Sequence, residues 1–113
     1  MLGRQQNNNL EEYEMHQMTA QELKKRLDEG QALNIIDVRE VDEVATGKIA
    51  GAVNIPLALL EFRMHELEKS KEYIVVCHAG GRSSRAVSYL EDYGFNVINL
   101  NGGMLAWYDE VHE

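Results

Sequence analysis

The chain has 113 residues, the usual size of a single domain. Hydrophobic residues make up 44% and charged residues 27%, ordinary proportions for a globular protein, so a buried core is expected. Nineteen acidic residues against eleven basic ones leave a net charge of −8. An acidic surface repels phosphate backbones, so nucleic-acid binding is disfavoured. The apolar runs are only a few residues long, so no membrane-spanning segment is predicted.

The single cysteine, Cys77, excludes an internal disulfide bond, and no signal peptide is recognisable at the N-terminus. Both observations favour a reducing compartment, which we take to be the cytoplasm. His16, His65 and His112 share no ligand-like spacing with one another or with Cys77. We therefore expect neither a metal nor a cofactor.

The N-terminal part is predicted to be a polar tail followed by one domain. Residues 1–14 contain few apolar groups, which favours disorder, so the domain is expected over residues 15–113. A helix is predicted from Thr19 to Glu29, because Thr19 and Glu22 match a capping box and two leucines four residues apart follow.

Strands and helices are predicted to alternate along the domain. Short runs of branched apolar residues predict strands, and apolar residues spaced three and four apart predict helices. A strand at 15–18 is expected before the helix from Thr19, and a strand at 33–38 after it. The elements that follow are a helix at 39–46, a strand at 52–55, a helix at 57–68, a strand at 73–77, a helix at 83–93, a strand at 97–100 and a helix at 104–110.

This alternation is typical of the α/β class, here a five-stranded parallel sheet with helices on both faces. The strand at 73–77 (YIVVC) is apolar on both faces and is therefore expected at the centre. The residues expected to face inward are Val41, Val44 and Ala45 in the second helix, Leu59, Leu60, Met64 and Leu67 in the third, and Ala86, Val87, Leu90 and Tyr93 in the fourth.

Cys77 ends the central strand, and a glycine-containing loop and a helix follow at once. In parallel α/β sheets the functional site lies beyond the carboxyl ends of the strands. Gly80 and Gly81 let the backbone amides converge on an anion, and the next helix adds its free N–H groups and the positive end of its dipole. We therefore expect a reactive Cys77 thiolate with a lowered pKa, and not an inert strand-end thiol.

The charges of the helix at 83–93 run against its dipole. Arg82 and Arg85 stand at its start, whereas Glu91 and Asp92 stand near its end, and each such placement is unfavourable. This pattern indicates that the arginines attract an anion, the alternative being that they pair with surface carboxylates. His78 is expected to face solvent, with a position at the mouth of the site as the alternative.

Three stretches of the sequence form a recognisable set of motifs. They are Asp37-Val38-Arg39-Glu40 with Glu43 and residues 47–56 (GKIAGAVNIP), the loop from Cys77 to Arg82, and residues 100–107 (LNGGMLAW). Together they resemble the single-domain rhodanese family of sulfurtransferases, and the resemblance covers about residues 16 to 110. Val44 stands where the family usually has an aromatic residue, and Lys48 where it usually has histidine, but neither lies in the cysteine loop.

The resemblance implies a rhodanese-like fold and a sulfurtransferase that needs no cofactor. Cys77 would take a sulfane sulfur from a donor such as thiosulfate or a persulfide, hold it as a Cys77 persulfide and pass it to a thiol or cyanide. Asp37 and Arg39 would brace the site. The residues that would bind the substrate are His78, Ala79, Gly80, Gly81, Arg82 and Ser83.

Three alternatives stay open on the sequence alone. The protein could be a persulfide carrier for a protein partner in sulfur trafficking, which differs only in the acceptor. A non-catalytic interaction module is less favoured, because such modules typically lack the cysteine. A related phosphatase is also less favoured, because phosphatases use a seven-residue loop, whereas Cys77 to Arg82 is six residues. Trp107 is expected in the core, and Gly102-Gly103 in a tight turn.

Overall fold

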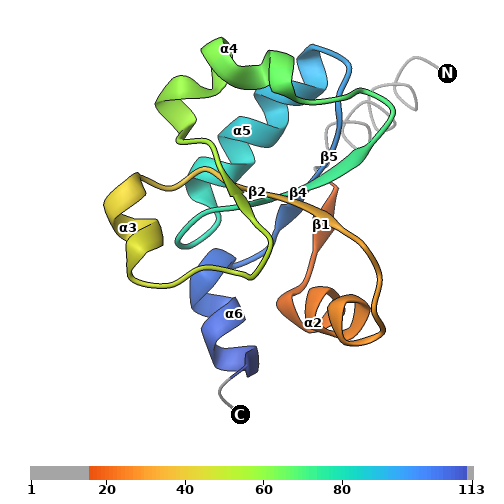
Figure 1. The fold of residues 1–113 in the computed structure, drawn as a ribbon, viewed down its shortest axis with the longest axis vertical. Coiled ribbons are helices and arrows are strands. Elements are labelled where there is room, and N and C mark those ends of the chain that lie inside the picture. The colour runs from red at the N-terminus through yellow and green to blue at the C-terminus, as the bar shows by residue number, and fades with distance from the viewer. Residues whose placement is uncertain (1–15, 112–113) are drawn as a thin grey trace, which may run out of the picture.

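The computed structural model describes residues 16–111, which form one α/β layer structure (Figure 1). The predicted fold class is confirmed: five parallel strands form one sheet in the order β1-β5-β4-β2-β3. The predicted tail at 1–14 lies outside the described residues. The strands are β1 (Gln17–Met18), β2 (Asn34–Asp37), β3 (Val53–Asn54), β4 (Glu72–Val76) and β5 (Asn96–Leu100).

Helices cover both faces of the sheet, with α4 and α5 on one side of the strands and α2 and α6 on the other (Figure 1). Two short 3₁₀ turns flank α4. The helical elements are α2 (Ala20–Asp28), α3 (Val41–Ala45), η1 (Leu57–Leu59), α4 (Leu60–Arg63), η2 (Met64–Glu66), α5 (Gly81–Asp92) and α6 (Gly103–Val111).

The core consists of two apolar clusters, one on each face of the sheet. Successive side chains of a strand point to opposite faces, so β4 supplies both. Tyr73 and Val75, with Cys77 directly after the strand, pack with α4 and α5, whereas Ile74 and Val76 pack with α2 and α6. This double burial explains why the sequence of β4 is apolar throughout.

The first helix begins as the sequence predicts. The Thr19 hydroxyl accepts a hydrogen bond from the Glu22 amide at 3.0 Å, and the Glu22 carboxylate accepts one from the Thr19 amide at 3.0 Å. Gly30 follows the helix with φ +82°, the left-handed backbone that favours glycine at a helix end.

Four of the residues predicted to face inward are exposed: Val41, Ala45, Leu59 and Tyr93. In α3 no residue is buried, and Val41 is 69% exposed, because polar contacts of Arg39 and Glu43 hold this short helix in place of apolar packing. The predicted helix at 57–68 is three short helical turns, and the rest of its apolar stripe does contact the core. Spacings of three residues fit a 3₁₀ turn as well as an α-helix, so the pattern could not separate them.

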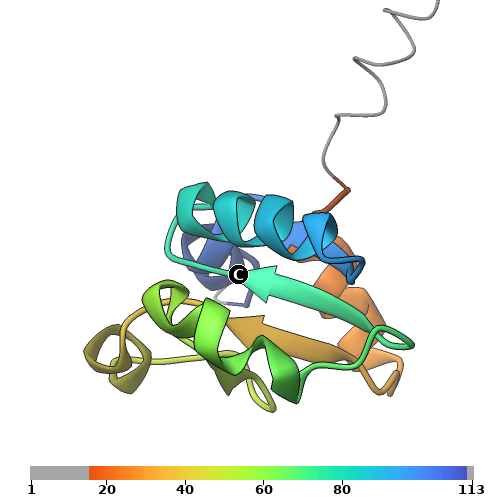
Figure 2. The ribbon, with the colours of Figure 1, turned by 90° about the horizontal axis from the view of Figure 1, so that it is seen from above.

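The carboxyl ends of β2 and β4 meet at one edge of the sheet. Their arrowheads point to the side of the molecule on which α3 lies (Figure 2). Asp37, the last residue of β2, stands opposite Val76, the last residue of β4. The register therefore places Asp37 next to the strand end that leads into Cys77.

The start of α6 is bound to the loop that follows β4. The Met104 amide donates to the Cys77 carbonyl at 2.8 Å, and the Leu105 amide donates to the His78 carbonyl at 3.0 Å. Gly103 makes this approach possible, since a Cβ on it would lie 2.7 Å from the carbonyl carbon of His78. The glycine pair is thus a point of close backbone contact as well as the expected turn.

We predict that Gly103→Ala destabilises the fold through this contact. Its φ of +57° adds backbone strain to the clash with carbonyl atoms, so we expect a loss of at least about 2 kcal/mol and a fall in Tm of roughly 8 to 16 °C. Gly81→Ala is the matched control, because a Cβ there meets nothing within 4 Å and its change should stay below about 1 kcal/mol. Equal melting curves for the two variants would contradict the prediction.

Candidate active site

Cys77 lies just beyond the end of β4 with its side chain 1% exposed. The Gly80 amide donates to Cys77 Sγ at 3.0 Å, and the Ser83 Oγ lies 3.3 Å from the same sulfur. Gly80 has a φ of +110°, a backbone conformation that side chains other than glycine rarely adopt. Helix α5 begins at Gly81, two residues earlier than predicted, so its first turn forms part of the loop.

Opposing effects set the pKa of the Cys77 thiol. Burial, the largest, raises the pKa because it penalises the charged thiolate. Hydrogen bonds from the Ser83 side chain and from the amides of Ser83, Gly80 and Ala79 lower it. Together these bonds prevail, and the pKa lies below the ordinary value of a cysteine thiol. The predicted direction of the shift is therefore confirmed.

Ser83 is itself held by Asn99, a residue that the sequence analysis missed. Asn99 is buried on β5, and its side-chain oxygen lies within hydrogen-bond distance of the Ser83 hydroxyl, whose single proton points either to this oxygen or to the Cys77 sulfur. Its amide nitrogen donates to the Ser84 hydroxyl at 3.4 Å. A polar residue inside an otherwise apolar strand was the available signal, since a buried amide needs hydrogen-bond partners.

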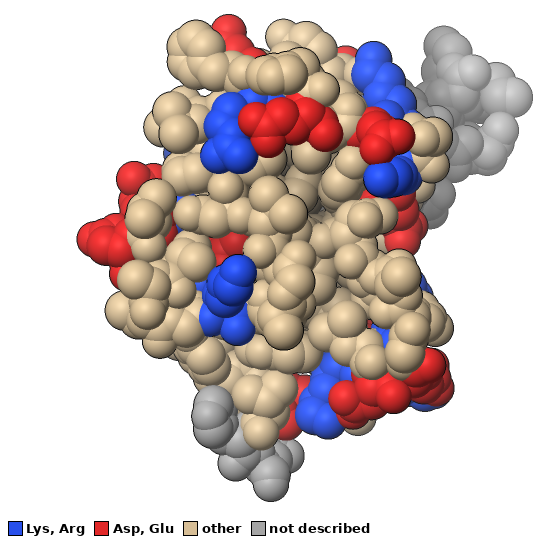
Figure 3. Space-filling model, in the orientation of Figure 1, with Lys and Arg blue, Asp and Glu red and all other residues tan. Residues whose placement is uncertain are grey.

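Arg82 is paired with Glu43 of α3. The guanidinium donates two hydrogen bonds to the carboxylate, at 2.6 and 2.8 Å, and both side chains are about one-third exposed. These bonds, followed by one from the Glu40 amide, lower the pKa of Glu43 to about 2. The sequence left two interpretations of the arginines, attraction of an anion or pairing with a surface carboxylate. Arg82 is paired with a carboxylate. Figure 3 shows acidic side chains projecting at the edge where α3 lies.

Asp37 and Arg39 form an ion pair, as the resemblance implied, with exposed fractions of only 1% and 2%. Arg39 also donates to the carbonyls of Gly47, at 2.7 Å, and Glu43, at 3.4 Å. These bonds tie the Asp37–Arg39 pair to the backbone of α3 and of the turn that follows it. Through Glu43, this support reaches Arg82.

A surface hollow of about 390 Å³ opens over the cysteine. Of the predicted site residues, Gly80 and Ser83 lie beneath it, in contact with the sulfur, while Asp37 and Arg39 are more remote. Arg85, which was left out of the predicted set, belongs to the wall, and His78 is exposed there. The lining residues are Cys77, His78, Ala79, Gly81, Arg82 and Arg85.

Residues 16–111 contain neither a metal-binding cluster nor a membrane span. No group of three histidine, cysteine or acidic residues in this range could hold a metal ion. No helix in the same range is long and apolar enough to cross a membrane.

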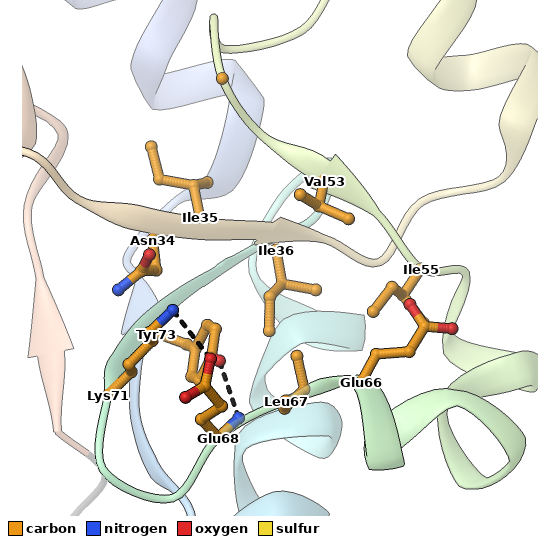
Figure 4. Close-up of a pocket in the computed structure, with 11 residues that line it drawn as sticks. Asn34, Ile35, Ile36, Val53, Ile55, Glu66, Leu67, Glu68, Lys71 and Tyr73 are labelled. Atoms are coloured by element: carbon orange, nitrogen blue, oxygen red, sulfur yellow. Dashed lines mark hydrogen bonds and ion pairs between the residues drawn. The ribbon is translucent and has the colours of Figure 1, made fainter.

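Another cavity, of about 310 Å³, lies at the opposite end of β2 (Figure 4). Ile36, Val53 and Tyr73 contribute to its wall, and Lys71 pairs with Glu68 at its rim. Its lining contains no cysteine, serine or histidine, so it offers no nucleophile of these kinds. The hollow over Cys77 is therefore the candidate active site.

Comparison with known proteins agrees with this assignment. The model of the rhodanese-like domain matches residues 19–110. A sulfurtransferase of Allochromatium vinosum is 33% identical over 94 residues, which are 82% of this chain and 88% of that protein. The thiosulfate sulfurtransferase GlpE of Shewanella oneidensis is 31% identical over 85 residues, covering 74% of this chain and 84% of that protein.

The same domain occurs in longer proteins. The maize adenylyltransferase and sulfurtransferase MOCS3-2 is 36% identical over 106 residues, which cover 87% of this chain but only 22% of the maize protein. The crystal structure of a rhodanese-like domain protein from Staphylococcus aureus superimposes with a TM-score of 0.80 at 39% identity, covering 82% of this chain and 91% of that one. On these matches, and on the three sequence stretches that the fold assembles around Cys77, the chain belongs to the rhodanese-like sulfurtransferase family.

Proposed function

We propose that this protein transfers a sulfane sulfur by way of a persulfide on Cys77. The observation that carries the proposal is the contact of the Gly80 amide and the Ser83 hydroxyl with the Cys77 sulfur. These groups stabilise a thiolate, which is the nucleophilic form of cysteine. Family membership supports the reaction class.

In the first half-reaction the Cys77 thiolate attacks the outer sulfur of a donor such as thiosulfate or a persulfide. A bond forms between Cys77 Sγ and that sulfur, and with thiosulfate the old S–S bond breaks, its electron pair leaving with sulfite. Covalent catalysis of this kind divides one transfer into two simpler ones. Hydrogen bonds from the loop residues Ala79 to Ser83 would then hold the negative outer sulfur.

In the second half-reaction an acceptor thiol or cyanide removes that sulfur and returns the Cys77 thiolate. The open hollow would also admit a protein thiol, so a persulfide carrier for a sulfur-relay partner is the alternative proposal. The six-residue loop from Cys77 to Arg82 favours sulfur compounds over phosphate esters. Cys77 must stay reduced between catalytic cycles, and this requirement supports a location in the cytoplasm, where thiols are kept reduced.

We predict that thiosulfate adds one sulfur, about 32 Da, to the intact protein and that dithiothreitol removes it, as thiol–disulfide exchange requires. Cys77→Ser should gain no mass and lose thiosulfate:cyanide transfer, because a serine hydroxyl is not ionised at neutral pH. Intact mass spectrometry and the cyanide assay measure both effects. Transfer activity retained by Cys77→Ser would refute the assignment of the nucleophile.

We predict that Cys77 reacts with iodoacetamide with a pH midpoint below that of free cysteine, since hydrogen bonds lower its pKa. Ser83→Ala removes the side-chain bond, the largest of the lowering effects, and should move the midpoint upward. Ser88→Ala, at an exposed position further along α5, is the control and should leave the profile unchanged. The prediction fails if Ser83→Ala and the wild type share one midpoint.

We further propose that Arg82 braces the loop through Glu43. The folded-state pKa of Glu43, about 2, lies below its ordinary value of 4.5. The pair therefore adds stability that is fully present above pH 4.5 and is lost as pH falls through about 2. The two side chains are partly exposed, so the contribution is at most about 1 kcal/mol.

Glu43→Gln should accordingly be less stable than the wild type at pH 7 and equal to it near pH 2. Urea unfolding across this range measures the difference. Asp109→Asn is the control, because it also removes one negative charge. Asp109 lies on α6, and its carboxylate forms no ion pair with any residue in the range 16–111. A constant Glu43→Gln difference at every pH would show that the ion pair contributes nothing.

A further inference from the structure

Arg85 lies at the mouth of the site and is unpaired among residues 16–111. Two arginines line the hollow over Cys77, and Glu43 already occupies the guanidinium of Arg82. The side chain of Arg85 is exposed and has no hydrogen bond or ion pair with any residue in the range 16–111. It follows Arg82 by three residues on α5, so both project from the same side of the helix. An anion that approaches Cys77 therefore meets the free guanidinium of Arg85.

Arg85 also lines a second hollow, of about 280 Å³. This hollow lies between α5 and the η1–α4 segment, and Leu57 and Tyr89 in its wall pack against the core. Since Arg85 belongs to both linings, the two hollows are neighbours, and this residue forms part of the wall of each. The lining residues are Leu57, Ala58, Leu60, Glu61, Arg85 and Tyr89.

The order in which Cys77, Arg85 and the second hollow follow one another indicates what kind of ligand would fit. A sulfur at Cys77 comes first, then a carboxylate within reach of Arg85, and then a short aliphatic body over Leu57 and Ala58. Arginine binds carboxylates with two parallel hydrogen bonds, which fixes direction as well as adding affinity. The volume of the second hollow, about 280 Å³, suits a small molecule and not a folded chain.

We propose that Arg85 selects the sulfur acceptor, and that the acceptor is a small thiol with a carboxylate close to its sulfur and its body in the second hollow. The inference rests on the sulfurtransferase function proposed above. The thiol loses its proton to water, and its thiolate attacks the outer sulfur of the Cys77 persulfide. A new S–S bond forms on the acceptor, the bond to Cys77 Sγ breaks, and Cys77 leaves as the thiolate. One sulfur atom moves and no oxidant or reductant is consumed.

The experiment isolates the second half-reaction, because thiosulfate is itself an anion that Arg85 could attract. The protein is loaded with thiosulfate, freed of it by gel filtration and checked by intact mass. Decay of the persulfide is then followed with 3-mercaptopropionate, its methyl ester and cysteamine, each rate being corrected for its thiolate fraction. We expect 3-mercaptopropionate to react about fivefold faster than the ester, as an exposed ion pair allows.

Variants assign this preference to Arg85. Arg85→Gln should bring the carboxylate and ester rates together, and Arg85→Lys should restore part of the difference. Lys25→Gln removes one positive charge from the opposite side of the molecule, on α2, and should behave as the wild type. Ala58→Trp fills the second hollow from an exposed position. It should slow 2-mercaptohexanoate, which has its carboxylate next to the sulfur-bearing carbon and a butyl chain beyond it, more than 3-mercaptopropionate.

The outcomes separate the two proposals. If no sulfur is loaded on Cys77, the sulfurtransferase function fails and this inference falls with it. If loading is normal but the wild type reacts equally with the carboxylate and its ester, only the acceptor inference is overturned. It is also overturned if reduced thioredoxin, a protein thiol, outcompetes 3-mercaptopropionate at equal thiolate concentration. An Arg85-dependent preference for the carboxylate supports the inference.

Discussion

The geometry around Cys77 depends on where the loop carbonyls point. The first amides of α6 bind the carbonyls of Cys77 and His78, so these two oxygens are turned away from the sulfur. The Ala79 N–H, which shares a peptide unit with the His78 carbonyl, then faces the sulfur together with the Gly80 amide. A peptide unit presents its N–H and C=O in opposite directions, so anchoring the carbonyl orients the rest of the turn. Helices α5 and α6 therefore act together, α5 by starting within the loop and α6 by holding it from behind.

Support from the other side comes through α3, a helix with no buried residue. Its position depends on Arg39, which is bound to Asp37 at the end of β2 and to the backbone around α3. Breaking such a buried ion pair by removing one partner leaves a charge without compensation, which typically destabilises a protein by about 3 to 5 kcal/mol. The fold thus joins the sheet, α3 and the cysteine loop through charged groups where apolar packing is missing.

Much of the fold followed from local patterns. The cap at Thr19, the doubly apolar β4 and the position of Cys77 at its end were all predictable, because each depends on neighbours in the sequence. The exposure of Val41 and Leu59 was not, since apolar spacing shows a helical face but not whether another element covers it. The ion pair of Glu43 with Arg82 joins residues 39 positions apart, and only the sheet register brings them together. The same holds for Asn99 and Ser83, whose contact depends on the packing of α5 on β5.

If Cys77 carries a persulfide as proposed above, the lone, buried thiol has a consequence for the fate of the outer sulfur. Many thiol enzymes carry a second, resolving cysteine that attacks a modified one and closes a disulfide. This chain has no other cysteine, so a persulfide formed on Cys77 would have no internal route of decay by thiol attack. The loaded form would then persist until an external nucleophile enters the hollow, and the protein could act as a store of activated sulfur whose release follows the concentration of acceptor.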